Sequence, residues 1–271
     1  MYDVLCATNI TEVREHDIYY DKIYYQTNEM LKELFHNFDV RGKDVLTVLA
    51  SSDQLFYAYN YGAKSVDTFD INKLAYYYYY LRKWGILYLD KYYPPIHDII
   101  FSHKFINDVF YRMNVVSEED REAYFFWREY CKHNLVFENS DLYYINTFPI
   151  DSTISDLSYL KSILETRKLS FKHLDITKEI DIDKKYDVII LSNIMEYLGY
   201  DTSYPQIIDN FNRLLKDDGI IVCSHFIFKE ARERFYLRGD FKYEEFPNFK
   251  KESSLKAEGK PIGYCYKKRY C

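Results

Sequence analysis

The sequence predicts an α/β fold in which helices cover a mostly parallel, doubly wound sheet. Two observations carry this prediction. Short apolar runs rich in β-branched residues recur along the chain, and such runs are typical of buried parallel strands. Helical patterns separate the runs, so that strand and helix alternate as in successive strand–helix–strand units. The clearest run, YDVIIL at residues 186–191, shows that the alternation continues late into the chain.

The first strand–helix–strand unit is the best-defined part of the sequence. Residues 44–49 (DVLTVL) and 64–70 (KSVDTFD) are predicted to be buried strands. Between them, Asp53 is placed to cap a helix over residues 54–61, and Gly62 is placed to end that helix. The two strands are expected to be parallel, because a connecting helix returns the chain to the same edge of the sheet.

Helices are also predicted on either side of this unit. Asn72 opens a helix that runs to about Trp84, where Gly85 is expected to stop it. Before the first strand, apolar residues within 11–38 recur at spacings of three and four, which predicts an N-terminal helix or helix pair. That segment is expected to cover one edge of the domain or to close over a ligand.

The alternation is interrupted between residues 86 and 169. Helices are predicted over residues 96–113, 118–133 and 155–167, with a loop over residues 139–152. A doubly wound fold needs only a short connection at this point. The block is therefore interpreted as a helical insertion between the second and third core strands.

The α/β pattern then resumes and completes the sheet. Its predicted elements are strands over 170–174, 186–191 and 220–228, a helix over 205–215, a turn over 217–219, and closing antiparallel strands over 243–249 and 263–269. The predicted domain organisation is an N-terminal helical cover over 1–40, a sheet domain over 41–85 and 170–271, and the insertion over 86–169.

The composition disfavours several classes of protein. The net charge of −6 disfavours a general nucleic-acid binder, which needs a basic face to neutralise phosphates. The five cysteines are scattered without a C-x-x-C pair, which disfavours a disulfide framework or a metal site and predicts reduced thiols in a cytoplasmic protein. No apolar run approaches the ~20 residues that span a bilayer, so no transmembrane segment is expected. The oligomeric state stays open.

Tyrosine is over-represented, with 31 residues and an unbroken run from Tyr76 to Tyr80. Five consecutive residues cover more than one helical turn, so they are not all expected to face one core. The run is interpreted as a compositional bias, with some rings buried and others half exposed, rather than as a platform for stacking bases.

The turn after the first strand is the first candidate ligand site, because ligands of open α/β sheets bind beyond the carboxyl ends of the strands. Ala50, Ser51 and Ser52 are small enough to let a ligand approach the backbone. Free N–H groups at the helix start can receive an anionic group. Asp53 is either an ordinary helix cap or an acceptor for an ammonium group. A dinucleotide is disfavoured, since Asp53 would repel a pyrophosphate and the G-x-G-x-x-G fingerprint is absent.

Acids follow the next two predicted strands at the same edge. Asp70, with Ile71 beside it, follows the turn by about 20 residues, a spacing suited to hydrogen bonds with ribose hydroxyls. Asp175, with its neighbour Ile176, is a candidate for binding an adenine amino group. A solvated strand-end acid is the alternative in both cases.

The strand over residues 186–191 leads into polar residues that are expected at the same edge. Ser192 is a candidate cofactor contact. The candidates for orienting a substrate or the cofactor are Asn193, Glu196 and Tyr197. Glu196 is also placed to cap a helix.

Five segments carry a resemblance to a known family: VLTVLASSDQ (45–54), VDTFDIN (66–72), HLDIT (173–177), YDVIILSNIMEYL (186–198) and LLKDDGIIVCS (214–224). Their order resembles that of the class I methyltransferases that use S-adenosylmethionine (SAM), and they extend over about two thirds of the chain. The resemblance implies a Rossmann-like fold, SAM as the cofactor, and a transferase that acts on a small-molecule or lipid-like acceptor.

The glycine-rich loop of ordinary methyltransferases, D/E-x-G-x-G-x-G, is not met. Thr47 stands at the position of the acid in this motif, and Leu49, Ser51 and Asp53 stand at the positions of its three glycines. The segment is similar to the 3-amino-3-carboxypropyl transferases of betaine-lipid synthesis, in which small residues and then Asp-Asn follow the strand; Gln54 replaces that Asn. Three alternatives follow: methyl transfer, aminocarboxypropyl transfer, and a non-catalytic SAM-binding module.

Overall fold

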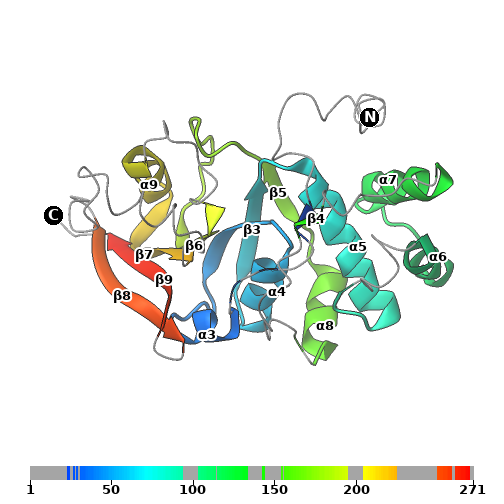
Figure 1. The fold of residues 1–271 in the computed structure, drawn as a ribbon, viewed down its shortest axis with the longest axis horizontal. Helices are drawn as coiled ribbons and strands as arrows, with labels where there is room; N and C mark the ends of the chain where they lie inside the picture. The colour runs from blue at the N-terminus through cyan, green and yellow to red at the C-terminus, as the bar shows by residue number, and fades with distance from the viewer. Residues whose placement is uncertain are drawn as a thin grey trace.

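The computed structural model describes residues 23–24, 27, 29, 31–93, 103–113, 115–133, 142–143, 154, 156–194, 204–224, 249–257 and 260–268. A seven-stranded sheet forms its centre (Figure 1), in the order β5-β3-β2-β6-β7-β9-β8. The strands are β2 (Asp44–Val48), β3 (Ser65–Asp70), β5 (Ser170–His173), β6 (Tyr186–Ser192), β7 (Leu215–Ser224), β8 (Phe249–Ala257) and β9 (Lys260–Lys268). The first five strands of this order (β5, β3, β2, β6 and β7) are parallel, and β9 is antiparallel to both of its neighbours, β7 and β8. The predicted fold class, a Rossmann-like and mostly parallel doubly wound sheet, is confirmed.

The strand order creates a topological switch point between β2 and β6. From β2 the chain moves outward to β3 and then β5, and it returns to β6 and β7 on the other side. Ligands of open α/β sheets bind beyond the carboxyl ends of the strands at such a point. The carboxyl ends of β2, β3 and β6, with the turns that follow them, are called the carboxyl edge below.

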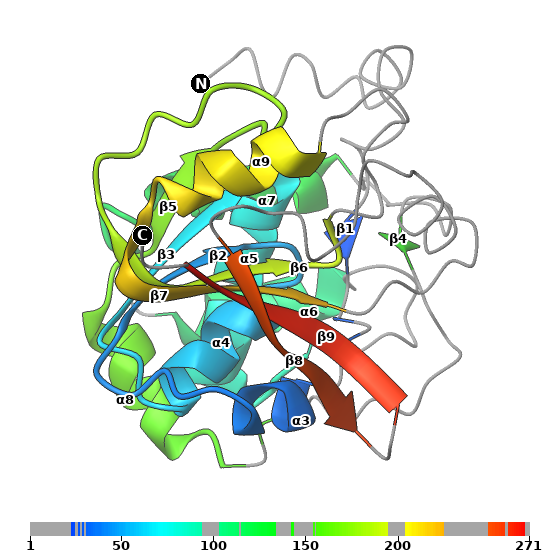
Figure 2. The same ribbon diagram turned by 90° about the vertical axis from the view of Figure 1, so that its left-hand side faces the viewer.

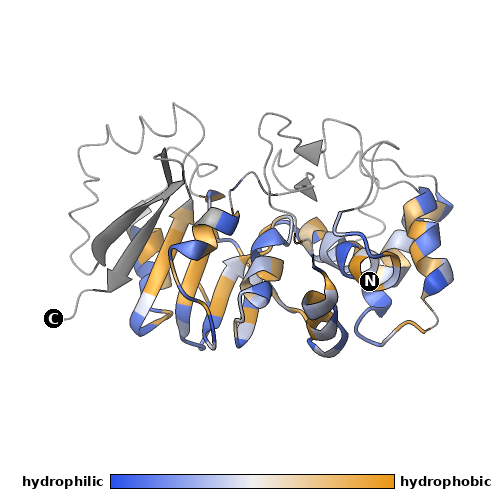
Figure 3. Cartoon of the chain, turned by 90° about the horizontal axis from the view of Figure 1, so that it is seen from below, coloured by the Kyte–Doolittle hydropathy of each residue, from blue (hydrophilic) through white to orange (hydrophobic). Residues whose placement is uncertain are grey.

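Helices pack on both faces of the sheet. Figure 2 shows α9 (Tyr204–Asn212) on one face, and α3 (Leu31–His36), α4 (Asp53–Asn60) and α8 (Ser158–Thr166) on the other. Alternate residues of the strands serve the two cores, because side chains alternate across a sheet. In β6, Val188 joins the core under α4, whereas Ile189 joins the core under α9. Figure 3, coloured by hydropathy, shows that the central strands are largely hydrophobic (orange).

Among the described residues between β3 and β5, three helices follow α5 (Lys73–Leu89), namely α6 (His103–Arg112), α7 (Arg121–Lys132) and α8. All three contact α5, and Figure 1 shows α6 and α7 at the opposite end of the molecule from β8 and β9. They fall within the range that was predicted as an insertion, and they share one apolar core with the sheet. The division of the chain into domains stays a prediction.

The tyrosine run is more deeply buried than predicted. Tyr77 to Tyr80 are at most 5% exposed, and Tyr76 is half-buried. The reason is that α5 has the sheet on one side and the three helices that follow it on the other, so most of its circumference is enclosed. Tyr77, for example, stacks on Phe126 of α7 with the ring centroids 4.0 Å apart.

The N-terminal segment differs from the predicted helix. Ile23–Tyr24 form the strand β1, which pairs in parallel with β4 (Leu142–Tyr143), where a loop was predicted. The apolar spacing indicates a helix, but the hydrogen-bonding partner of this segment comes from a distant part of the chain, which spacing does not reveal. Helix α3 lies within the predicted range, and residues 11–22 lie outside the described residues.

Gly85 does not stop α5, which continues to Leu89. A Cβ atom at Gly85 would lie 2.8 Å from Cζ of Phe105, so the glycine allows α6 to pack closely against α5. The glycine therefore serves helix–helix packing rather than helix termination. Asn72, by contrast, caps α5 as predicted, because its side chain accepts a hydrogen bond from the backbone N–H of Leu74.

The end of the sheet also differs in detail. The predicted turn over 217–219 is part of β7, whose pairing with β6 has an irregularity there, because Tyr186 pairs with Leu215 and Val188 with Ile220. Extra residues on one strand of a pair form a bulge rather than a turn. β9 lies close to the predicted closing strand over 263–269. The structure also has the strand β8 from residue 249 onward, whereas residues 243–248 of the other predicted strand lie outside the described residues.

Candidate functional site

The turn between β2 and α4 has a backbone typical of glycine, although it contains none. Ala50 and Ser52 have φ values of 41° and 72°, and Ser192 at the end of β6 has a φ of 54°. Left-handed conformations strain residues that carry a Cβ atom, and such strain is concentrated at functional sites. The chain thus builds a glycine-type turn at the carboxyl edge from small residues.

We predict that Ser52→Gly stabilises the fold by about 1 kcal/mol. Glycine relieves the φ of 72° and removes an Oγ that is fully buried without a hydrogen-bond partner among the described residues. Unfolding in urea measures the change. Ser51→Gly is the matched control, since Ser51 has no positive φ and its Oγ donates to Oδ2 of Asp53 (2.7 Å), so it should destabilise the fold. A lower free energy of unfolding for Ser52→Gly would contradict the prediction.

Asp53 is the first residue of α4 and is fully buried. Its Oδ2 accepts hydrogen bonds from the backbone N of Thr27 (2.8 Å) and Oγ of Ser51 (2.7 Å). Its Oδ1 accepts from Nη1 of Arg82 (2.8 Å) and the hydroxyls of Tyr92 (3.1 Å) and Tyr93 (2.9 Å). The cation that Asp53 binds in this structure is therefore Arg82, and the contact with a ligand ammonium group stays a prediction.

Arg82, on α5, supports the turn from the side of the core. Its guanidinium is fully buried and donates to the backbone O of Ser51 and of Tyr92, and it lies over the ring of Tyr93 at 4.3 Å. Burial by itself lowers the pKa of Arg82, but Asp53 and the tyrosines raise it above its ordinary value, so the group stays charged. Sequence reasoning missed Arg82, because a single arginine in a tyrosine-rich helix has no distinguishing pattern.

Asp70 ends β3, and its carboxylate reaches the turn after β2. Oδ2 accepts a hydrogen bond from the backbone N of Ala50 (2.8 Å), and Oδ1 accepts one from the backbone N of Asn72 (2.8 Å). Burial raises the pKa of Asp70 to about 6. The next residue, Ile71, has its carbonyl O 2.7 Å from Nε2 of His173. The structure thus joins the predicted ribose acid to the strained turn.

A glutamate of the N-terminal segment also lies at the carboxyl edge. Glu29 is buried, and its Oε2 accepts hydrogen bonds from Oγ of Ser192 (2.9 Å), Oγ1 of Thr27 (3.2 Å) and Nε2 of Gln54. Burial raises the pKa of Glu29 to about 7. No sequence pattern identified Glu29, because its partners on α4 and β6 are remote in the chain.

The predicted adenine acid forms a local turn in this structure. Oδ1 of Asp175 accepts hydrogen bonds from the backbone N (2.9 Å) and Oγ1 (2.7 Å) of Thr177. Ile176, between them, is buried. Contact of Asp175 and Ile176 with an adenine stays a prediction.

The polar residues after β6 are placed in part. Ser192 and Asn193 are both buried, and Oγ of Ser192 lies 3.4 Å from Oδ1 of Asn193. Ser192 also contacts Gln54 at the start of α4, with Oγ 3.2 Å from Nε2. The structure thus brings together the residues predicted after β2 and after β6. Glu196 and Tyr197 lie outside the described residues.

Buried carboxyl groups outnumber buried cationic side chains at the carboxyl edge, within the described residues. Its buried ionisable side chains, within the described residues, are Glu29, Asp53, Asp70 and Arg82. Three carboxylates and one guanidinium sum to a formal charge of −2 when all are ionised. A site with more carboxylates than cationic side chains attracts a cationic ligand and repels an anionic one.

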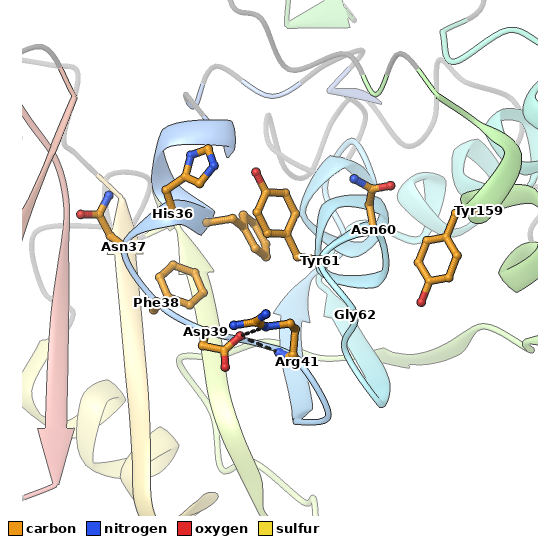
Figure 4. Close-up of a pocket in the computed structure, with 10 residues that line it drawn as sticks. His36, Asn37, Phe38, Asp39, Arg41, Asn60, Tyr61, Gly62 and Tyr159 are labelled. Carbon is orange, nitrogen blue, oxygen red and sulfur yellow. Dashed lines mark hydrogen bonds and ion pairs between the residues drawn. The ribbon is translucent and has the colours of Figure 1, made fainter.

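A separate pocket of about 720 Å³ lies at the other ends of the strands, away from the carboxyl edge (Figure 4). Phe35, Phe38 and Tyr61 supply aromatic rings to its wall, and Asp39 and Arg41 form an exposed ion pair of 3.0 Å beside it. These residues precede β2 or β3, so the pocket lies at the amino ends of the strands. Its position does not match the switch-point site of an open α/β sheet.

The part of the chain that the structure describes contains no group of three or more His, Cys, Asp or Glu side chains placed to hold a metal ion. None of its helices combines the length and the apolar character needed to span a bilayer.

No protein-family model matches the sequence, and no curated protein matches it. Among solved structures, the chain is 13% identical to the ribosomal protein L11 methylase of Lactobacillus delbrueckii subsp. bulgaricus, with 89% of this chain and 77% of that chain covered and a TM-score of 0.38. It is 9% identical to the N-methyltransferase NodS of Bradyrhizobium japonicum WM9 in complex with S-adenosyl-L-homocysteine (SAH), with 89% and 84% covered and a TM-score of 0.42.

Proposed function

We propose that the protein is a SAM-dependent transferase that methylates a small-molecule or lipid-like acceptor. The observation that carries this proposal is the placement of Asp70 beside the strained turn at the switch point. Backbone N–H groups of Ala50 and Asn72 fix its two oxygens. A carboxylate has about four acceptor sites, so both oxygens can still accept hydrogen bonds from ribose hydroxyls.

The charge of the carboxyl edge favours SAM over a dinucleotide. SAM carries a positive sulfonium, a positive ammonium and a negative carboxylate, whereas a dinucleotide carries a negative pyrophosphate. Buried polar atoms that lack partners among the described residues, Oγ of Ser52 and Oε1 of Gln54, offer further hydrogen-bonding sites there. These features fit a cationic nucleoside.

Each predicted residue has a task in this proposal. Ala50, Ser51, Ser52 and Asp53 form the turn over which the cofactor lies, Asp70 and Ile71 hold the ribose, Asp175 and Ile176 hold the adenine, Ser192 and Asn193 face the methionyl end, and Glu196 and Tyr197 orient the acceptor. When bound, SAM supplies an electrophilic carbon next to its sulfonium. The protein then has to position the acceptor and exclude water.

Titration calorimetry with SAM and SAH tests the proposal. We expect both ligands to bind with a Kd in roughly the micromolar range. No heat with either ligand, at protein concentrations well above that range, would overturn the proposal. Analysis of the by-product then identifies the transferred group, since methyl transfer leaves SAH and aminocarboxypropyl transfer leaves 5′-methylthioadenosine. Binding without either product across a broad acceptor screen supports a non-catalytic module.

A further inference from the structure

We infer that Glu29 binds the ammonium group at the methionyl end of SAM, an inference that rests on the proposed function. The chain lacks an acid at Thr47, where the glycine-rich loop of ordinary methyltransferases would carry one. Thr47 is uncharged and fully buried, and its Oγ1 donates to the backbone O of Val48 (3.2 Å). An acid from the N-terminal segment, Glu29, instead contacts the start of α4 through Gln54 and the end of β6 through Ser192.

The position of Glu29 relative to Asp70 supports this role. β3 and β6 lie on opposite sides of β2 in the sheet. Asp70 ends β3 and contacts the turn through the N–H of Ala50, whereas Glu29 contacts the end of β6 through Ser192. A nucleoside whose ribose is held by Asp70, and which extends over the turn towards β6, therefore reaches Glu29.

The groups around Glu29 also match an ammonium ion. An ammonium group has three donors and no acceptor, so its site needs several acceptors close together. Oε2 of Glu29 lies beside the amide of Gln54, whose Oε1 is buried and has no donor among the described residues. A carboxylate and an amide oxygen that needs a donor are suited to an ammonium group and unsuited to a carboxylate or phosphate.

Asp53, the other acid near the turn, is less suited to this role. Its carboxylate already accepts hydrogen bonds from five donors, and one of them is the guanidinium of Arg82. Glu29 accepts hydrogen bonds from the side chains of Thr27, Gln54 and Ser192. Burial and repulsion by Asp53 raise the pKa of Glu29 to about 7, and a bound cation would oppose both effects.

A ligand series tests the inference. SAM and SAH both carry the ammonium group, SAH lacks the sulfonium charge, and 5′-methylthioadenosine lacks the whole amino-acid portion. We expect Glu29→Gln to weaken SAM and SAH by the same factor, about tenfold or more, and to change the affinity for 5′-methylthioadenosine by less than about twofold. Titration calorimetry of each ligand with wild type and variant gives these factors.

Other outcomes would overturn the inference. If Glu29→Gln weakened SAM alone, Glu29 would interact with the sulfonium rather than with the ammonium group. If it weakened all three ligands equally, Glu29 would only maintain the structure of the site. Unchanged affinities would remove it from the site. If the wild type binds none of the three ligands, the proposed function itself fails, which is a distinct result.

Two more variants make the test robust. Gln54→Leu keeps Glu29 but removes the amide oxygen that lacks a donor, so it should also weaken SAM and SAH and spare 5′-methylthioadenosine. Equal weakening of all three ligands by this variant would also count against the inference. Glu129→Gln is the matched control, because Glu129 pairs with Lys132 on the exposed part of α7. It should leave all three affinities unchanged, and thermal unfolding of each variant verifies the fold.

Discussion

Asp70→Asn is expected to weaken SAM binding about 100-fold or more, because a hydrogen bond to a charged group contributes roughly 1.5–3 kcal/mol and the ribose makes two of them. The substitution also replaces one carboxylate oxygen with an NH2 group. That group cannot accept the hydrogen bond that the backbone N–H of Ala50 or of Asn72 donates to Asp70. Asp70→Ala removes the acceptors altogether and should abolish measurable binding. Titration calorimetry with SAM measures both effects.

Asp67→Asn is the control for this prediction. Asp67 lies on the same strand but bonds Lys184 and Tyr186, away from the carboxyl edge. SAM affinity should therefore stay at the wild-type value in this variant. A weakening by Asp70→Asn that is no larger than that of Asp67→Asn would remove Asp70 from the cofactor site.

The pH dependence of wild-type binding provides a second check on Asp70. Burial raises its pKa to about 6 in the free protein, and ribose hydroxyls favour the ionised carboxylate as acceptor. Below that pH the carboxyl group must lose a proton before it can accept both hydrogen bonds. Affinity for SAM is therefore expected to fall as the pH falls below about 6. Glu29, with a pKa of about 7, adds a fall of its own that begins at higher pH, so the contribution of Asp70 is the part of the fall below about pH 6 that is lost in Asp70→Asn.

Arg82→Met is expected to lower the free energy of unfolding by about 3–5 kcal/mol, because it leaves the buried carboxylate of Asp53 without its cation. The backbone O atoms of Ser51 and Tyr92 lose their donor as well. Methionine fills most of the space among the aromatic rings, so the loss reports mainly charge and hydrogen bonds. Unfolding in urea measures it, provided that the transition is two-state.

Two comparisons isolate the buried pair. Arg41→Met removes an arginine whose side chain is 80% exposed and paired with Asp39, so it should change stability by less than about 1 kcal/mol. The double variant Asp53→Asn, Arg82→Met should be more stable than the sum of the two single effects predicts, because it leaves no uncompensated charge. If Arg82→Met destabilised the fold no more than Arg41→Met, the buried pair would not support the turn.

The sequence predicted the elements whose signals are local. The runs that became β2, β3 and β6 were recognised from apolar, β-branched residues, and their ends were predicted to within one residue. Asn72 was recognised as the cap of α5 from its residue type and position. The boundaries that failed, such as Gly85 and the turn over 217–219, were those at which packing or strand pairing outweighs the usual preference of a residue.

The sequence by itself determined the parallel α/β architecture and the acid that ends β3, because periodicity, caps and strand ends act between residues that are close in the chain. Only the tertiary structure decided which charged side chains lie beside the turn after β2 and which residues hold that turn in place. Ser192 reaches Glu29 across 163 positions, and Arg82 reaches Asp53 across 29. Such contacts depend on how elements pack, and a buried charge is stable only where packing supplies its partners. No local pattern records that condition.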